Sequence, residues 1–93
     1  MAVLVILEIE ASSDDYDKAN AKIDAASNPP DGLVVHTAEE TGGKMRIVDV
    51  WESAGQFESF SQERVGPAVA EALGDDAPSP SVEIRELHNM ERF

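Results

Sequence analysis

The stretch that decides the fold is residues 47–57, Ile-Val-Asp-Val-Trp-Glu-Ser-Ala-Gly-Gln-Phe. Its first half is rich in β-branched residues, which favour a strand. Ser53-Ala-Gly-Gln56 then matches a capping box, in which the serine hydroxyl and the glutamine amide satisfy amide protons left free at a helix start. The junction predicts a strand over residues 44–52 that runs into a helix with Phe57 and Phe60 on one stripe.

A hairpin precedes this junction. Residues 33–39 form another extended run, and Gly42-Gly43, at the end of Glu40-Thr-Gly-Gly43, suits a two-residue turn before the strand over 44–52. With such a turn, His36 would stand directly across from Asp49. The same parity puts Val34, His36 and Ala38 on one face with Ile47, Asp49 and Trp51. A three-residue loop with a bulge would reverse this arrangement.

The first part of the chain adds a strand and a helix. Residues 3–10 are short, β-branched and apolar on both parities at first, which is typical of a central strand. Ser12 to Asp15 supply N-cap oxygens and negative charge for a first turn. The helix that follows is expected to run to about Ala26, with Tyr16 on its apolar stripe. Asn28 to Gly32 contain two prolines and predict a turn.

The last part of the chain completes the pattern. Gly66-Pro67 should break or bend the second helix, which Gly74 caps. Residues 75–80 are predicted to be a polar loop, and residues 81–88 alternate as a fourth strand. The order βαββαβ predicts an α+β, ferredoxin-like domain with an antiparallel four-stranded sheet over residues 1–93.

Both faces of this sheet are expected to be apolar. Helices cover only one face in this topology, yet Leu4, Ile6, Val48 and Val50 would lie on the other. A chain of 93 residues also has room for only a modest core. We therefore expect a homodimer in which a second sheet covers the bare face.

Composition limits the partners. The chain carries 19 acidic and 7 basic residues, a formal charge of −12, which repels nucleic acid backbones and anionic lipid surfaces. The absence of cysteine excludes disulfides and thiolate chemistry. The apolar run at the start ends at Glu8 with no basic region before it, so we expect a cytoplasmic protein that binds neither nucleic acid nor membrane.

The strand-to-helix junction at residues 47–57 resembles that of the dimeric α/β barrel superfamily, which includes the antibiotic-biosynthesis monooxygenases and many uncharacterised small bacterial proteins. Residues 32–37 and 64–67 resemble segments of uncharacterised members. The resemblance implies a dimer whose two sheets form a barrel, with a ligand cavity between the sheet and helices of each subunit. It implies diverse chemistry, from cofactor-independent oxygenation and isomerisation to haem-dependent reactions and ligand binding, and the fold does not choose among these.

His36 and Asp49 are the candidate catalytic residues. A carboxylate beside an imidazole favours the charged ring and fixes its tautomer, as a general base requires. We expect this pair to face a cavity walled by substrate-binding aromatic residues, namely Trp51, Tyr16, Phe57 and Phe60. The alternative is a polar pair inside a small core, with Trp51 as a core residue at the corner between sheet and helix.

Arg64 and His88 are further candidates for substrate binding. Arg64 falls late in the second helix, where it could bind a carboxylate or phenolate, or cap the helix and pair at the surface. His88 ends the fourth strand, where it could equally belong to a strand end. We expect no metal, because His36, His88, Asp49 and Glu86 have no recognised ligand spacing. We also expect no other cofactor, since the chain is short for a haem site.

The sequence thus predicts a small homodimer that binds an apolar or aromatic molecule between sheet and helices. The activity that the resemblance suggests is cofactor-independent monooxygenation. The alternative is a non-catalytic dimeric module that binds a ligand or a protein and uses the same residues as core.

Overall fold

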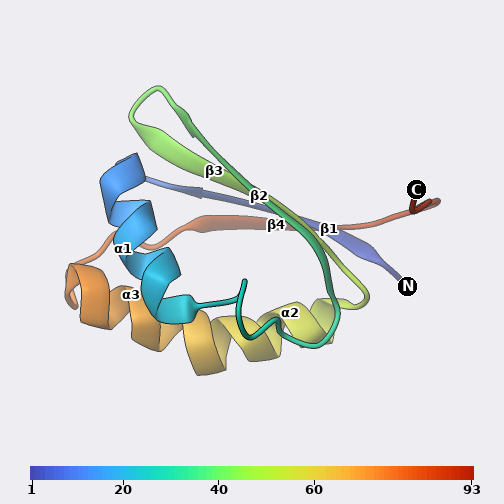
Figure 1. Cartoon of the computed structure of the whole chain (residues 1–93). Helices are drawn as coiled ribbons and strands as arrows, with labels where there is room; N and C mark the ends of the chain where they lie inside the picture. The colour runs from blue at the N-terminus through green and yellow to red at the C-terminus, as the bar shows by residue number, and fades with distance from the viewer.

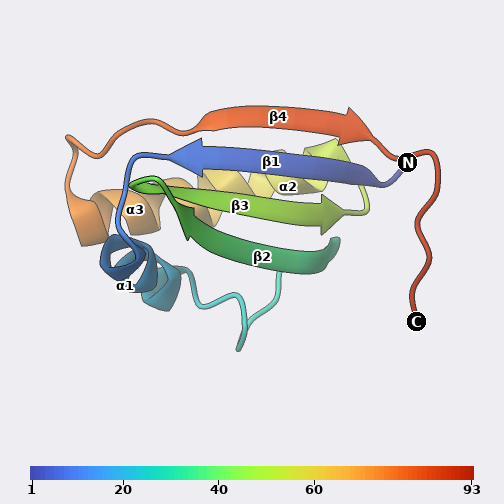
Figure 2. The same cartoon turned by 90° about the horizontal axis from the view of Figure 1, so that it is seen from above.

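The computed structural model describes residues 1–93. The elements follow in the order β1 (Val3–Ile9), α1 (Ser13–Ile23), β2 (Leu33–Thr41), β3 (Lys44–Trp51), α2 (Ala54–Phe60), the π-helical turn η1 (Ser61–Val65), α3 (Gly66–Leu73) and β4 (Ser81–Glu86). The four strands form one antiparallel sheet in the order β2-β3-β1-β4. All helices pack on one side of it (Figure 1), and Figure 2 looks onto the other side, which no helix covers. The predicted element order and sheet are confirmed.

The hairpin between β2 and β3 has the predicted two-residue turn. Thr41 pairs with Lys44, and the glycines between them have φ of 57° and 80°, as a two-residue hairpin turn with positive φ at both positions requires. His36 pairs with Asp49 as predicted. The start of β2 differs, because Leu33 pairs with Trp51 and the register shifts before Val35. Leu33 therefore takes the position predicted for Val34.

Helix α1 is shorter than predicted and ends at Ile23 rather than near Ala26. Ser12 caps its start by accepting the Asp15 amide proton. At the other end Asp24 adopts a left-handed conformation with φ of 53°, which ends the helix.

The sequence predicted that Gly66-Pro67 breaks or bends the second helical segment, and the segment continues without a break. Proline lacks the amide proton of a helical hydrogen bond and its ring collides with the carbonyl four residues earlier. The chain accommodates it with η1, where the Gly66 amide donates to the carbonyl of Ser61, five residues back. This wider turn leads into α3, which has Pro67 in its first turn.

The capping box at Ser53 differs from the prediction in the partner of the Gln56 side chain, which is the Ser53 hydroxyl and not a backbone amide. The Ser53 hydroxyl oxygen accepts the Gln56 amide proton at 3.3 Å, and the same hydroxyl donates to the side-chain oxygen of Gln56. Gln56 also packs against Gly32, where a Cβ atom would lie within 2.4 Å of its side-chain oxygen and where φ is 92°. A glycine is required at this crossing of the two connections.

The core lies between the sheet and α2. Val3, Val5, Trp51 and Phe57 are buried together, with Leu33 and Phe60 among the residues packed on them. Only 8 of the 93 residues are buried in the isolated chain, which is a small core even for a domain of this size. None of the helices has the length and apolar character needed to cross a bilayer.

Candidate functional site: a cavity between the sheet and helix α1

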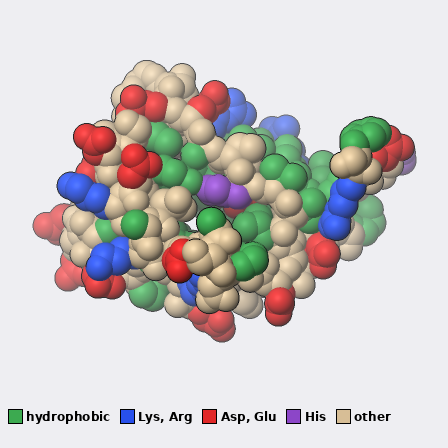
Figure 3. All heavy atoms as spheres, in the orientation of Figure 1, with side chains coloured by type: hydrophobic (Ala, Val, Ile, Leu, Met, Phe, Trp, Pro, Cys, Tyr) green, Lys and Arg blue, Asp and Glu red, His purple; other side chains and the backbone are tan.

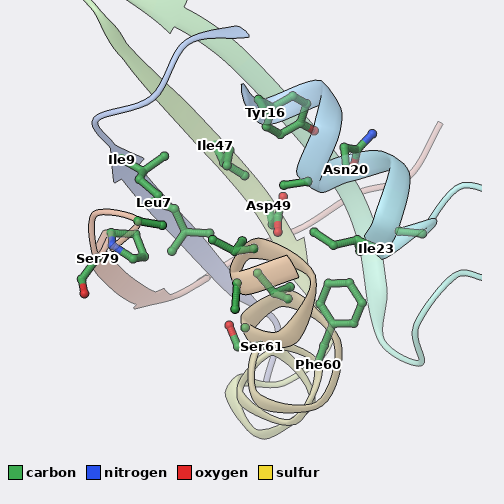
Figure 4. Close-up of a pocket in the computed structure, with 18 of the residues that line it drawn as sticks. Leu7, Ile9, Tyr16, Asn20, Ile23, Ile47, Asp49, Phe60, Ser61 and Ser79 are labelled. Carbon is green, nitrogen blue, oxygen red and sulfur yellow. The ribbon is translucent and has the colours of Figure 1, made fainter. Parts of the chain in front are cut away.

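A cavity of about 430 Å³ lies between the sheet and the helices. Its lining comes from β1, α1, β2, β3, the helical segment from α2 to α3, and the loop from Gly74 to Pro80. Figure 4 shows the apolar side chains Leu7, Ile9 and Ile47 on the sheet side of the cavity, and Phe60 on the helix side. Most of the lining is apolar, as in other small-molecule sites.

Four polar side chains form a connected row beside this cavity. Asp49 is only 7% exposed, and its two carboxylate oxygens are both occupied. One accepts from His36 Nδ1 at 2.7 Å, and the other accepts from Trp51 Nε1 at 3.2 Å. The remaining ring nitrogen, His36 Nε2, lies 2.5 Å from the Tyr16 hydroxyl oxygen.

This geometry fixes the proton positions. A carboxylate can only accept, so Nδ1 of His36 carries the proton that Asp49 receives. In the neutral ring Nε2 then has a lone pair, which accepts the Tyr16 hydroxyl proton. The Tyr16 and His36 rings are nearly parallel, with an interplanar angle of 12°. The row therefore runs from the buried indole of Trp51 to the phenol of Tyr16 in the cavity wall. The lone pair on His36 Nε2 is free to accept a proton from a ligand when the Tyr16 hydroxyl does not donate to it.

The surroundings alter the protonation of two members of the row. The hydrogen bond from Asp49, assisted by its negative charge, raises the pKa of His36 above the ordinary value of 6.5, although partial burial acts in the opposite direction. Burial raises the pKa of the Tyr16 phenol above 10.0, and the charges of Asp49 and Asp17 add to this effect. His36 is thus a stronger base than a free imidazole, and Tyr16 stays protonated near neutral pH.

The cavity brings together five of the residues proposed from the sequence, namely His36, Asp49, Tyr16, Phe57 and Phe60. Figure 3 shows a histidine in a hollow on this face of the molecule, with hydrophobic side chains beside it and acidic side chains over the neighbouring helices. The His36 side chain is 35% exposed, so it can be reached from the cavity and from solvent.

The other three proposed residues lie elsewhere. Trp51 is fully buried, packs edge-on against Phe57, and does not line the cavity. Arg64 donates to the backbone carbonyls of Ile23 and Asn28 and stacks over Phe60, so it holds the end of α1 in place. His88 is exposed beyond the end of β4. None of the three has the access to the cavity that substrate binding requires.

Several lining residues escaped the sequence analysis. Leu7 and Ile9 share the parity of the core positions on β1, so strand alternation could have found them, and Ile47 was placed on the face of Asp49 without being proposed as a lining residue. The loop residues Ala77, Pro78 and Pro80 also line the cavity, and nothing periodic in their sequence indicates this. No three histidine or acidic side chains come together as a metal site would need.

No protein-family model and no curated protein matches this chain in sequence. Solved structures do match. A candidate antibiotic biosynthesis monooxygenase from Deinococcus radiodurans superposes with a TM-score of 0.71 at 15% identity, over 98% of this chain and 97% of that one. SnoaB, a cofactor-independent oxygenase from Streptomyces nogalater, gives 0.68 at 13% identity, over 96% and 95%. A candidate antibiotic biosynthesis monooxygenase from Nitrosomonas europaea gives 0.71 at 8% identity, over 97% and 94%.

At these identities the likeness shows the fold. The chain has the ferredoxin-like α+β fold of these monooxygenase-like structures over nearly its whole length, which confirms the predicted fold class and the predicted structural resemblance.

Proposed function

We propose that this chain forms a homodimer whose subunits each bind a small apolar or aromatic molecule in the cavity, and that His36 removes a proton from it for a cofactor-independent oxygenation. The observation that carries the proposal is the pair of hydrogen bonds on Asp49. They hold the carboxylate still and leave His36 with its proton on Nδ1 and its lone pair on Nε2.

The chemistry requires an activated CH₂ or phenolic group on the substrate. The His36 imidazole takes a proton, and the resulting carbanion passes electrons to O₂. For a CH₂ group flanked by aromatic rings, one oxygen atom becomes a carbonyl on that carbon and the other leaves as water, with both hydrogens of the CH₂ group in that water. The electrons come from the substrate, so the residues need only bind it, take the proton and return it.

The cavity favours this proposal over a non-catalytic module. A module that used the same residues as core would have them packed, whereas here apolar walls surround an open space with His36 and Tyr16 at one side. Convergent polar groups with an altered pKa in a cleft are typical of functional sites.

The other face of the sheet supports the proposed dimer. Leu4 and Ile6 of β1 lie beside Val48 and Val50 of β3, and none is covered by a helix. Val35 of β2 continues this patch and is 48% exposed. Charged residues border it, with Glu8 opposite Arg46 and Arg85 paired to Glu83 at 2.6 Å. An apolar centre with a charged border is the usual composition of a subunit interface.

The test is turnover of anthrone and quinol substrates by the purified protein. We expect His36→Ala to lower the rate about 100-fold or more, because general-base catalysis contributes about that much. The same change at His88, which lies outside the cavity, is the matched control and should leave the rate unchanged. Equal turnover by the His36→Ala variant and the wild type would remove the catalytic role of His36.

A further inference from the structure

The cavity contains no positive charge that could bind an anion. Its 24 lining residues include no lysine or arginine, and the only acidic ones are Asp49 and Asp75. Its other polar side chains are neutral or, like His36, paired. A ligand that enters with a negative charge would leave water and find no fixed cation to pair with, which is unfavourable in an apolar site.

Two cations adjacent in sequence to lining residues are already engaged. The Arg64 guanidinium donates to the carbonyls of Ile23 and Asn28, and the Lys22 ammonium pairs with Glu71 at 3.1 Å. Neither Arg64 nor Lys22 lines the cavity. Recruiting Arg64 would also leave the carbonyls near the end of α1 without their hydrogen-bond donor.

His36 does not supply the missing charge. When its ring is protonated, Asp49 stands 2.7 Å from it, so the two charges cancel as seen from the cavity. The net charge of −12 adds a repulsive field around the whole chain. An anion would therefore meet only neutral donors and a His36 whose charge Asp49 offsets.

The geometry points to a cavity that selects an uncharged apolar ligand with one proton-donating group and excludes carboxylates and other permanent anions. This deepens the proposed function, on which it rests for the use of the same cavity. A neutral phenol or activated CH₂ compound can enter without charge and become an anion only when His36 takes its proton. The proton moves within the site, so the net charge of the cavity does not change, whereas a permanent anion would bring an additional negative charge from solvent.

Two probes with one ring system test the selection. 2-Naphthol is uncharged and 2-naphthoate is negative at about pH 7.5. Isothermal titration calorimetry of the wild-type protein should show naphthol bound at least about tenfold more tightly than naphthoate. Equal affinity for the two probes would overturn the charge selection while leaving the ligand site in place.

An introduced cation should reverse the preference. Asn20 lines the cavity one helical turn after Tyr16 and is exposed on α1 (Figure 4). We expect Asn20→Lys to tighten naphthoate binding about threefold or more with little change for naphthol. The matched control is Ala21→Lys, which makes the same addition on the same helix at an exposed position outside the cavity. It should leave both affinities as in the wild type.

The outcomes separate this inference from the proposed oxygenation. A wild-type protein that prefers naphthol, combined with unchanged turnover in His36→Ala, would sustain charge selection and end the catalytic proposal. Equal tightening of naphthoate by Asn20→Lys and Ala21→Lys would show that the field of the whole chain acts, and the local inference would fail. Binding of neither probe would overturn the charge selection, while turnover of anthrone by the wild type would still decide the proposed oxygenation.

Discussion

The two faces of the sheet are built from alternate residues of the same strands, yet they differ in one respect. On β3, Asp49 and Trp51 face the helices, and Val48 and Val50 face away from them. The covered side holds a row of polar groups with paired hydrogen bonds. The bare side has an apolar centre. Strand parity separates the proposed proton-transfer site from the proposed dimer surface.

The largest effect is expected from a charge introduced into the apolar centre of the bare face, and the quantity that changes is the dissociation constant of the dimer. Val50→Asp places a carboxylate in the apolar centre of the proposed interface, and in a symmetric dimer it does so twice. Because an unpaired buried charge costs several kcal/mol, we expect the dissociation constant of the dimer to rise about 100-fold or more. Analytical ultracentrifugation over a concentration series measures it.

A control for this variant is Gln62→Asp, which adds the same charge on the exposed surface of η1. It should leave the dimer intact. A wild-type chain that sediments as a monomer at micromolar concentration would contradict the proposed interface outright.

A smaller effect is expected from a change in the polar row on the covered side. Asp49→Asn retains an oxygen that can accept from Trp51, but the amide group would donate to His36 Nδ1. The imidazole proton must then move to Nε2, which removes the lone pair that faces Tyr16. We expect about 100-fold lower turnover, a lower pKa of His36 because its main cause of elevation is gone, and a stability loss of about 1 to 2 kcal/mol.

The tautomer change gives this prediction a readout independent of activity. Nitrogen chemical shifts of the His36 ring should show the proton on Nδ1 in the wild type and on Nε2 in the variant. The matched control is Asp17→Asn, the same chemical change at an exposed position of α1. Unchanged ring shifts in Asp49→Asn would mean that Asp49 does not set the tautomer.

The sequence was sufficient to predict the facing of His36 and Asp49. A turn of two glycines fixes the register of the hairpin, and register fixes which side chains stand opposite each other. The bulge at the start of β2 could not be predicted in the same way. It lies next to Gly32, which meets the Gln56 side chain, a contact between segments 24 positions apart (56 minus 32).

The burial of each side chain was harder to predict from the sequence than the face on which it lies. Parity places Trp51 and Asp49 on one face, but only the packing of α2 decides that Trp51 is covered and that Asp49 borders the cavity. The partners of Arg64 are two backbone carbonyls, one at the end of α1 and one in the turn after it, and backbone groups carry no signature in the sequence. The loop from Gly74 to Pro80 has no period, so its place in the cavity wall comes only from the structure.

The smallest expected effect is the dependence of stability on pH from His36. Its pKa is raised in the folded chain, so folding favours the protonated ring. That stabilisation is fully present below the unfolded pKa of about 6.5 and is lost as the pH rises through the folded value. Because the side chain is 35% exposed, solvent screening should keep the contribution below about 1 kcal/mol. The measurement is the free energy of unfolding of the wild type and of His36→Gln, at equal protein concentration, between about pH 5.5 and 8.5.

A double-mutant cycle assigns this pH dependence to the pair. The difference between wild type and His36→Gln should be largest at the acidic end and shrink as the imidazole loses its proton. In the Asp49→Asn background the same difference should be nearly independent of pH, because the group that stabilises the charged ring has gone. A pH-dependent difference of equal size in both backgrounds would mean that a charge other than Asp49 stabilises the protonated His36. The polar row would then hold these side chains in position without raising the pKa of His36.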